Sequence, residues 1–217
     1  MGSITRSFAN NITTSGVLLP ASLTNNSIAN VTAYNASVAT GGMKLISSQT
    51  ASNSASISFT TGIDSTYKEY QFYFIDIHPR TDSANFNFNM SIDAGSNYNV
   101  TKTSTAFRAL HTENDSTALL QYETPWDLAQ STSDQSIAPS LGFEAKESAG
   151  GSLQLFNPSS TTYVKHWISR FSAVQETPYA YDFNSAGYGN TTSAVNAVRF
   201  QMSSGNFDGT ILLYGIV

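Results

Sequence analysis

Cysteine is absent from this chain of 217 residues, and charged side chains make up only 12% of it. The lack of cysteine excludes disulfide bonds, thiolate chemistry and cysteine-ligated metal sites. The net charge of −5 includes no basic run that could neutralise phosphates, so we expect no nucleic-acid partner. Residues 1–8 lack the apolar stretch of a signal peptide, and no window is long and apolar enough for membrane insertion. The sequence therefore predicts a protein that is made in a cytoplasm.

Aromatic residues, by contrast, are plentiful, with 13 phenylalanines and 11 tyrosines. They can fill a core, so we expect a globular fold rather than a disordered chain. The clearest pattern is the run 85–92, whose apolar members are Phe86, Phe88, Met90 and Ile92. Because successive side chains of a strand point to opposite faces, this run predicts a strand with one apolar and one polar face. The polar face carries asparagine and serine, and whether it meets solvent or another chain stays open.

Other alternating or apolar runs also predict strands, at residues 55–60, 67–77, 105–111, 118–122, 136–145, 153–155, 163–171, 195–203 and 210–216. The run 67–77 is apolar on both sides, which predicts burial of both faces. One helical turn is expected at 124–127, with Thr124 as its N-cap. Roughly nine to eleven strands with almost no helix indicate an all-β fold, for which an antiparallel jelly-roll-like β-sandwich is the economical arrangement.

Residues 1–42 differ in composition from the rest, being rich in Ser, Thr, Asn, Ala and Gly. This segment is either a flexible tail or an extended N-terminal arm that orders against another subunit, and its spaced apolar residues favour the arm. The residues assigned to assembly are Ile4, Phe8, Ile12 and Leu18. Gly41 and Gly42 mark a junction. We therefore expect an attachment or assembly arm at 1–42 and a β-sandwich domain at 43–217.

Catalytic and metal-binding patterns are scarce. The sequence has no nucleophile elbow, zinc-protease motif or glycine-rich phosphate loop. Asp76 and His78 form one polar cluster, and His111 and Asp115 belong to another that lacks the glycine of a calcium loop. Solvated turns explain both better than metal sites. We expect no catalytic residue, no metal and no cofactor, although a glycosidase could draw its two carboxylates from distant strands.

Long polar loops are expected at 93–104 and 175–192, and loops at the ends of a rigid sandwich often carry binding. The second contains several tyrosines among glycines, a composition found in binding loops because tyrosine supplies contact area at low entropic cost. Ligand contact, subunit contact and simple packing all remain open for this loop. The residues assigned to ligand contact are Tyr179, Tyr181, Tyr188 and Trp126.

The stretch Gly2–Gly16 resembles the N-termini of structural and tail-fibre-like proteins of tailed phages, especially marine bacteriophages. The globular part resembles a module of such virion proteins at residues 44–48, 60–70, 95–103, 155–163 and 209–217. The resemblance implies an oligomeric, β-rich virion protein exposed on the particle, with a homotrimer favoured. It also implies that the arm contacts other virion proteins and that the sandwich is displayed for host attachment, with a surface glycan as a candidate receptor.

Three functions are consistent with these observations. A short tail fibre or appendage that attaches to the host is favoured. A capsid head decoration or cement protein is the first alternative, in which the arm lies along the capsid surface. A carbohydrate-active enzyme is the lesser alternative, and it requires two carboxylates about 5–10 Å apart in one cleft.

Overall fold

The computed structural model describes residues 42–175 and 179–217. These residues form 12 β-strands and one turn of 3-10 helix, which confirms the expected all-β class. Residues 1–41 of the predicted arm, including Ile4, Phe8, Ile12 and Leu18, lie outside the described residues. In the part of the chain that is described, no helix is long and apolar enough to cross a membrane.

The short helix η1 (Thr124–Trp126) lies between the sixth and seventh strands. The strands are β1 (Met43–Ser54), β2 (Ser56–Phe59), β3 (Glu69–Pro79), β4 (Ala84–Ser91), β5 (Lys102–Thr112), β6 (Ala118–Tyr122), β7 (Gln135–Leu141), β8 (Ala149–Phe156), β9 (Lys165–Val174), β10 (Tyr179–Gly189), β11 (Ala197–Met202) and β12 (Phe207–Ile216). Every strand predicted from the hydrophobic pattern is present, with ends that differ by a few residues.

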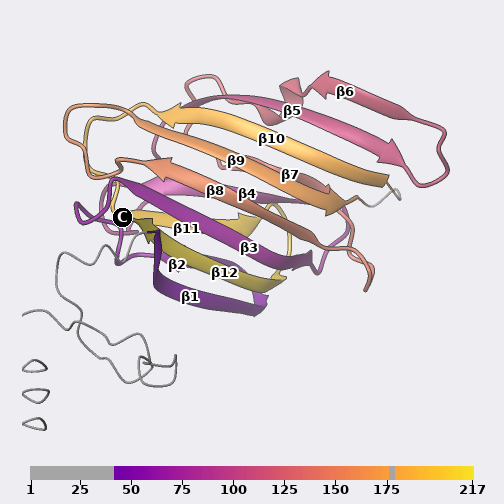
Figure 1. Cartoon of the computed structure of the whole chain (residues 1–217), viewed down its shortest axis with the longest axis horizontal. Helices are drawn as coiled ribbons and strands as arrows, with labels where there is room; N and C mark the ends of the chain where they lie inside the picture. Colours follow the sequence, from indigo (N-terminus) through magenta and orange to yellow (C-terminus); the bar gives the residue numbers. More distant parts are fainter. Residues whose placement is uncertain (1–41, 176–178) are drawn as a thin grey trace, which may run out of the picture. The chain divides into compact units, whose positions relative to one another are not determined.

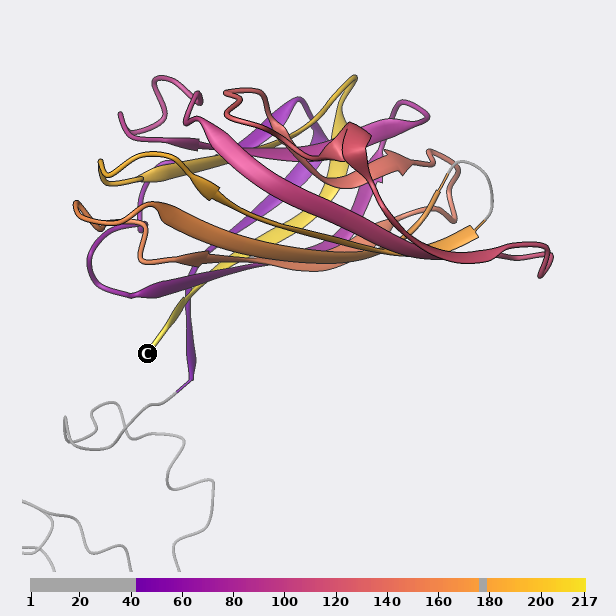
Figure 2. The ribbon, with the colours of Figure 1, turned by 90° about the horizontal axis from the view of Figure 1, so that it is seen from above.

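Two antiparallel sheets face one another in a sandwich, with the larger sheet in front in Figure 1 and the two layers seen from above in Figure 2. The smaller sheet has the order β2-β11-β4-β7, and the larger begins with β1-β12-β3-β8. Strands that are adjacent in the chain, such as β1 and β2 or β3 and β4, lie in opposite sheets. This connectivity is that of a jelly roll. The strands β9, β10, β5 and β6 extend the larger sheet beyond β8 to eight strands.

Phe200 of β11 is the centre of an aromatic core between the sheets. Its ring centroid lies 5.1 Å from that of Phe72 and 4.9 Å from that of Phe74, both on β3 of the opposite sheet. Its ring also stacks on Phe86 of the neighbouring strand β4, at 6.0 Å. All four side chains are buried. Edge-to-face and offset aromatic pairs contribute about 0.5–1.5 kcal/mol beyond the burial of their area, so this cluster holds the two sheets together.

Polar groups replace aromatic rings where the larger sheet extends past β8. Ser104 of β5 donates a hydrogen bond of 2.6 Å to the side-chain oxygen of Gln135 on β7. Gln135 in turn donates to the carbonyl of Trp126 at 2.8 Å. Ser169 and Ser185 share a buried hydroxyl–hydroxyl hydrogen bond of 2.7 Å between β9 and β10. Since buried polar groups are costly unless paired, these directional bonds fix how the added strands sit over β7.

The prediction of a loop at 175–192 is wrong for residues 179–189, which form β10. This strand pairs along its length with β5 on one side and β9 on the other. Its glycines are required by packing, since a Cβ at Gly187 would lie 2.5 Å from the carbonyl oxygen of Thr103 and 2.8 Å from the indole of Trp167. A composition typical of a loop thus belongs to a strand whose neighbours approach closely.

Three smaller expectations are also wrong. Strand β3 is not buried on both faces, because Tyr73 is 37% and Ile75 47% exposed. Ile92 is exposed because β4 ends before it. The N-cap of η1 is Glu123 rather than Thr124, and it makes no side-chain capping bond.

Replacing Phe200 by Ala should lower the free energy of unfolding by about 3–5 kcal/mol, because the cavity would face both sheets. Urea unfolding followed by circular dichroism measures this difference. Leu120→Ala, at an exposed position of β6, is the control and should change the free energy by less than about 0.5 kcal/mol. Similar small losses for both variants would contradict the central role of Phe200.

Candidate functional site

The aromatic residues predicted to contact a ligand lie in different parts of the sandwich. Tyr179 and Tyr181 point to the inner side of β10, Tyr188 lies on the outer face of the larger sheet, and Trp126 belongs to η1. Tyr179 packs against the core, and its hydroxyl accepts a hydrogen bond of 3.3 Å from Arg108. The structure therefore does not bring these four side chains together into one site.

Tyr181 is a core residue. Its hydroxyl donates a hydrogen bond of 2.7 Å to the carbonyl of Pro139 on β7. Burial, which disfavours the charged phenolate, raises the pKa of Tyr181 well above its ordinary value. In contrast to the sequence-based expectation, this side chain offers no surface to a ligand.

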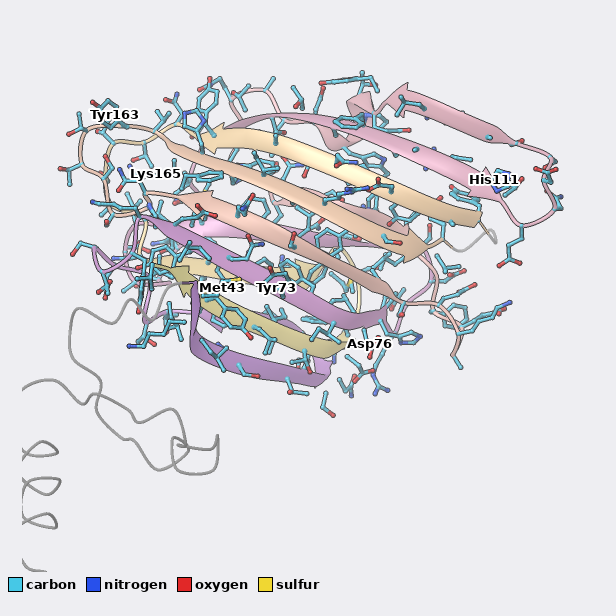
Figure 3. The ribbon with its side chains drawn as sticks, viewed as in Figure 1. Met43, Tyr73, Asp76, His111, Tyr163 and Lys165 are labelled. Carbon is cyan, nitrogen blue, oxygen red and sulfur yellow. The ribbon has the colours of Figure 1, made fainter. Side chains whose placement is uncertain are left out.

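The outer face of the larger sheet carries an apolar patch over β1, β12 and β3. Its members are Met43, Leu45, Tyr73, Ile75, Leu212, Tyr214 and Ile216. The Tyr73 and Tyr214 rings meet edge to face at 5.8 Å, and the Tyr73 hydroxyl lies 3.7 Å from the sulfur of Met43. Figure 3 shows Met43 and Tyr73 projecting from this sheet. No described segment covers the patch, although such side chains are usually buried.

An open depression of about 510 Å³ lies farther along the same face, over Gly187. Ile168, Tyr188 and His166 line it, and the last two rings are 6.1 Å apart. The lining is mostly apolar, so the depression continues the apolar character of this face rather than providing a polar binding site.

The outer face of the smaller sheet is polar, and Asp134 organises it. Its carboxylate accepts hydrogen bonds from Asn89 at 2.7 Å and from Gln201 at 2.6 Å, and it lies 3.4 Å from Arg199. The guanidinium of Arg199 stacks over the ring of Tyr98 at 4.6 Å. The loop before β7 therefore covers part of the asparagine face of β4. Asn89 meets neither solvent nor a second chain, because its own chain buries it.

A polar pocket of about 160 Å³ opens between this face and η1. Its polar and aromatic lining includes Asn85, Asn87, Trp126, Asp127, Asp134 and Ser136. Asn87 and Ser136 are cross-strand partners on β4 and β7. They are only 8% and 7% exposed, and the buried hydroxyl of Ser136 has no hydrogen-bond partner among the described residues. Buried polar groups are nearly always paired, so the Ser136 hydroxyl marks the pocket as a candidate binding site.

The sequence pattern indicated Trp126 but not the two polar groups that line the same pocket. Asn87 was recognised only as part of a polar strand face, and Ser136 is one of many serines in the chain. The repeated use of amides along 85–92 was the only signal. It could not identify which polar side chains would line a pocket, because that depends on the loop that covers their neighbours.

Two lysines are buried near the ends of strands. The Lys102 ammonium donates to the side-chain oxygen of Asn89 at 2.7 Å and to the carbonyl of Val100 at 2.8 Å. Desolvation lowers the pKa of Lys102 from 10.5 to about 8, and the charge of Asp134 opposes this shift. Lys165 donates to the carbonyl of Tyr163 at 2.6 Å, and desolvation lowers its pKa as well. Both ammonium groups bind main-chain carbonyls at loop ends, which assigns them a structural role.

The histidine clusters form local contacts. A ring nitrogen of His78 lies 3.1 Å from the carbonyl oxygen of Glu144, and a ring nitrogen of His111 lies 2.9 Å from Asp115 across an exposed turn. Among the described residues, no group of three or more histidine, aspartate or glutamate side chains could hold a metal ion. These clusters therefore supply no arrangement that points to metal chemistry.

No family model, curated protein or solved structure matches this chain. The fold places it in the class of antiparallel jelly-roll β-sandwiches. Because this class supports many unrelated functions, the function must be argued from the two outer faces and the pocket.

Lys102 should make stability depend on pH. Because the folded-state pKa is lower than the unfolded one, the unfolded state binds more protons above about pH 8 and stability rises with pH. Between about pH 7.5 and 9.5 the wild type should gain about 2 kcal/mol relative to Lys102→Met. Urea unfolding of both proteins at the two pH values measures this gain. An equal pH dependence of stability in both proteins would show that folding does not lower the pKa of Lys102.

Proposed function

We propose that this protein is a structural protein of a phage virion, made in the host cytoplasm and displayed on the particle as a short tail fibre or similar appendage. Residues 1–42 dock on other virion proteins, and the jelly roll is displayed outward for attachment to the host. The resemblance of residues 2–16 to phage proteins supports this proposal. The fold is compatible with it, since jelly rolls occur in viral capsid and lectin domains.

The observation that carries the proposal is the uncovered apolar patch on β1, β12 and β3. Leu45, Ile75 and Met43 are each between 45% and 51% exposed, on a rigid sheet. Burial of apolar area is favourable by about 25 cal/mol per Å², so a partner that covers the patch is stabilised. Aromatic residues and methionine are enriched at protein interfaces, and contiguous exposed patches of this kind mark interaction sites.

A second copy of this chain is the partner that fits the patch. The patch starts at Met43, which follows the proposed arm directly in the sequence. The members of the patch are uncharged, and Glu69, which pairs with Ile216 at its edge, accepts a hydrogen bond of 2.9 Å from Gln154. An uncharged apolar surface can face its own copy without repulsion, and symmetric homo-oligomers are the common outcome. A trimer is favoured for a fibre, in line with the resemblance.

The location of the protein on purified phage particles tests the proposal most simply. Electron microscopy with a gold-labelled antibody should place the protein at the tail. Label over the head would support the decoration-protein alternative, and particles without label would contradict a virion role.

Deleting residues 2–42 should abolish incorporation into particles while the isolated sandwich still folds, because the arm makes the docking contact.

A charge placed in the patch tests the contact between copies. Tyr73→Lys should raise the dissociation constant of the oligomer at least about 100-fold, because an unpaired charge in a dry interface costs several kcal/mol. Analytical ultracentrifugation measures this change. Thr132→Lys, at an exposed position outside the patch, is the matched control and should leave the oligomer unchanged. Equal assembly of both variants would exclude the patch as the interface.

A further inference from the structure

We propose that the pocket between η1 and the smaller sheet binds one unit of a neutral sugar. In this site Asn87 and Ser136 form a hydrogen-bonding floor, and Trp126 of η1 lines one side. The inference rests on the proposed function, since it names the ligand class that the displayed sandwich recognises. The pocket lies on the outer face of the smaller sheet, so a ligand can bind there while the apolar patch on the larger sheet is covered by another copy.

The pocket floor contains a buried polar group without a hydrogen-bond partner among the described residues, the Ser136 hydroxyl. Asn87 and Ser136 lie side by side on adjacent strands, and both are more than nine-tenths buried. A buried polar group without a partner destabilises a fold, whereas the neighbouring Asn89 has its partners within the protein. A ligand that supplies hydroxyl groups can pair with the Ser136 hydroxyl and with the neighbouring Asn87 amide. The Ser136 hydroxyl is therefore placed for recognition rather than for folding.

The chemistry of the lining matches a sugar hydroxyl, which donates and accepts at once. The Asn87 amide offers two donors and an acceptor, and the Ser136 hydroxyl offers one donor and acceptor sites. One oxygen of Asp127 accepts a hydrogen bond of 2.6 Å from Tyr122, which orients the carboxylate at the pocket and leaves its other oxygen as an acceptor. Trp126 also lines the pocket while its side chain packs partly against the core.

The charge and the volume of the pocket restrict the class of ligand further. Asp127 and Asp134 both line the pocket, and Arg199 is paired with Asp134, so no cation remains among the lining residues to attract an anion. Phosphate and acidic sugars are therefore disfavoured. A volume of about 160 Å³ is well below that of a drug-sized pocket. This space is suited to a single sugar unit or the end of a glycan chain.

Saturation-transfer NMR on the full chain tests the site. The probes are the methyl glycosides of glucose, galactose, mannose and N-acetylglucosamine, together with N-acetylneuraminic acid and inorganic phosphate. At least one neutral glycoside should receive saturation, and the two anions should not. Ser136→Ala and Trp126→Ala should each weaken binding about tenfold or more. Ser133→Ala, an exposed serine of the same loop, should bind as the wild type does.

Ser136→Ala separates loss of binding from loss of fold. Removing a buried hydroxyl that has no partner should leave the urea midpoint unchanged or higher. The proposal would be overturned if no neutral glycoside bound, or if only the anions bound. Binding at the wild-type level by both pocket variants would also overturn it. Release of reducing sugar from a neutral oligosaccharide would replace binding with hydrolysis by the two carboxylates.

The particle experiments distinguish this inference from the virion proposal. Ser136→Ala protein should enter particles normally, because the pocket lies outside the arm and the patch. Sugar binding by a protein that is absent from particles would refute the virion role alone. If the protein enters particles but binds none of the sugars, the sugar site alone is refuted.

Discussion

The contact between the two sheets through Phe200 is the constraint on which the rest of the molecule depends. Its ring meets Phe72 and Phe74 across the sandwich, and this fixes the inner face of each sheet. Because side chains alternate along a strand, the inner residues then determine the outer ones between the β-bulges. The exposure of Tyr73 and the position of Asn87 both follow from this one packing choice.

The two outer faces have opposite chemical character, and the connection through η1 causes much of the difference. On the smaller sheet, that connection brings Asp134 and Trp126 over the asparagine face and leaves a polar pocket beside Asn87. On the larger sheet, no described segment crosses the apolar patch. One face is thus suited to recognising a polar ligand and the other to excluding water against another subunit. This difference between the faces agrees with the proposed role of a displayed, assembled module.

The strand positions and the buried side of β4 could be predicted, because bulky apolar residues with a period of two have one packing solution. Strand β10 could not be predicted. Its inward positions include Ser185 and Gly187, which fit only against particular neighbours. The pocket could not be predicted either. Asn87 and Ser136 meet through the register of β4 with β7, and Trp126 reaches them from a connection with no periodic pattern.

Hydroxyl-radical footprinting of assembled particles tests most directly the claim that the two faces have different roles. Oxidation of each aromatic and methionine side chain is compared between particles and the free protein diluted to its monomeric state. We expect Met43, Tyr73 and Tyr214 to be protected in particles, because another copy covers the apolar patch. Trp126 should stay as reactive as in the free protein, because the pocket faces outward. Full reactivity of Met43 and Tyr73 in particles, or protection of Trp126 without added sugar, would contradict this account.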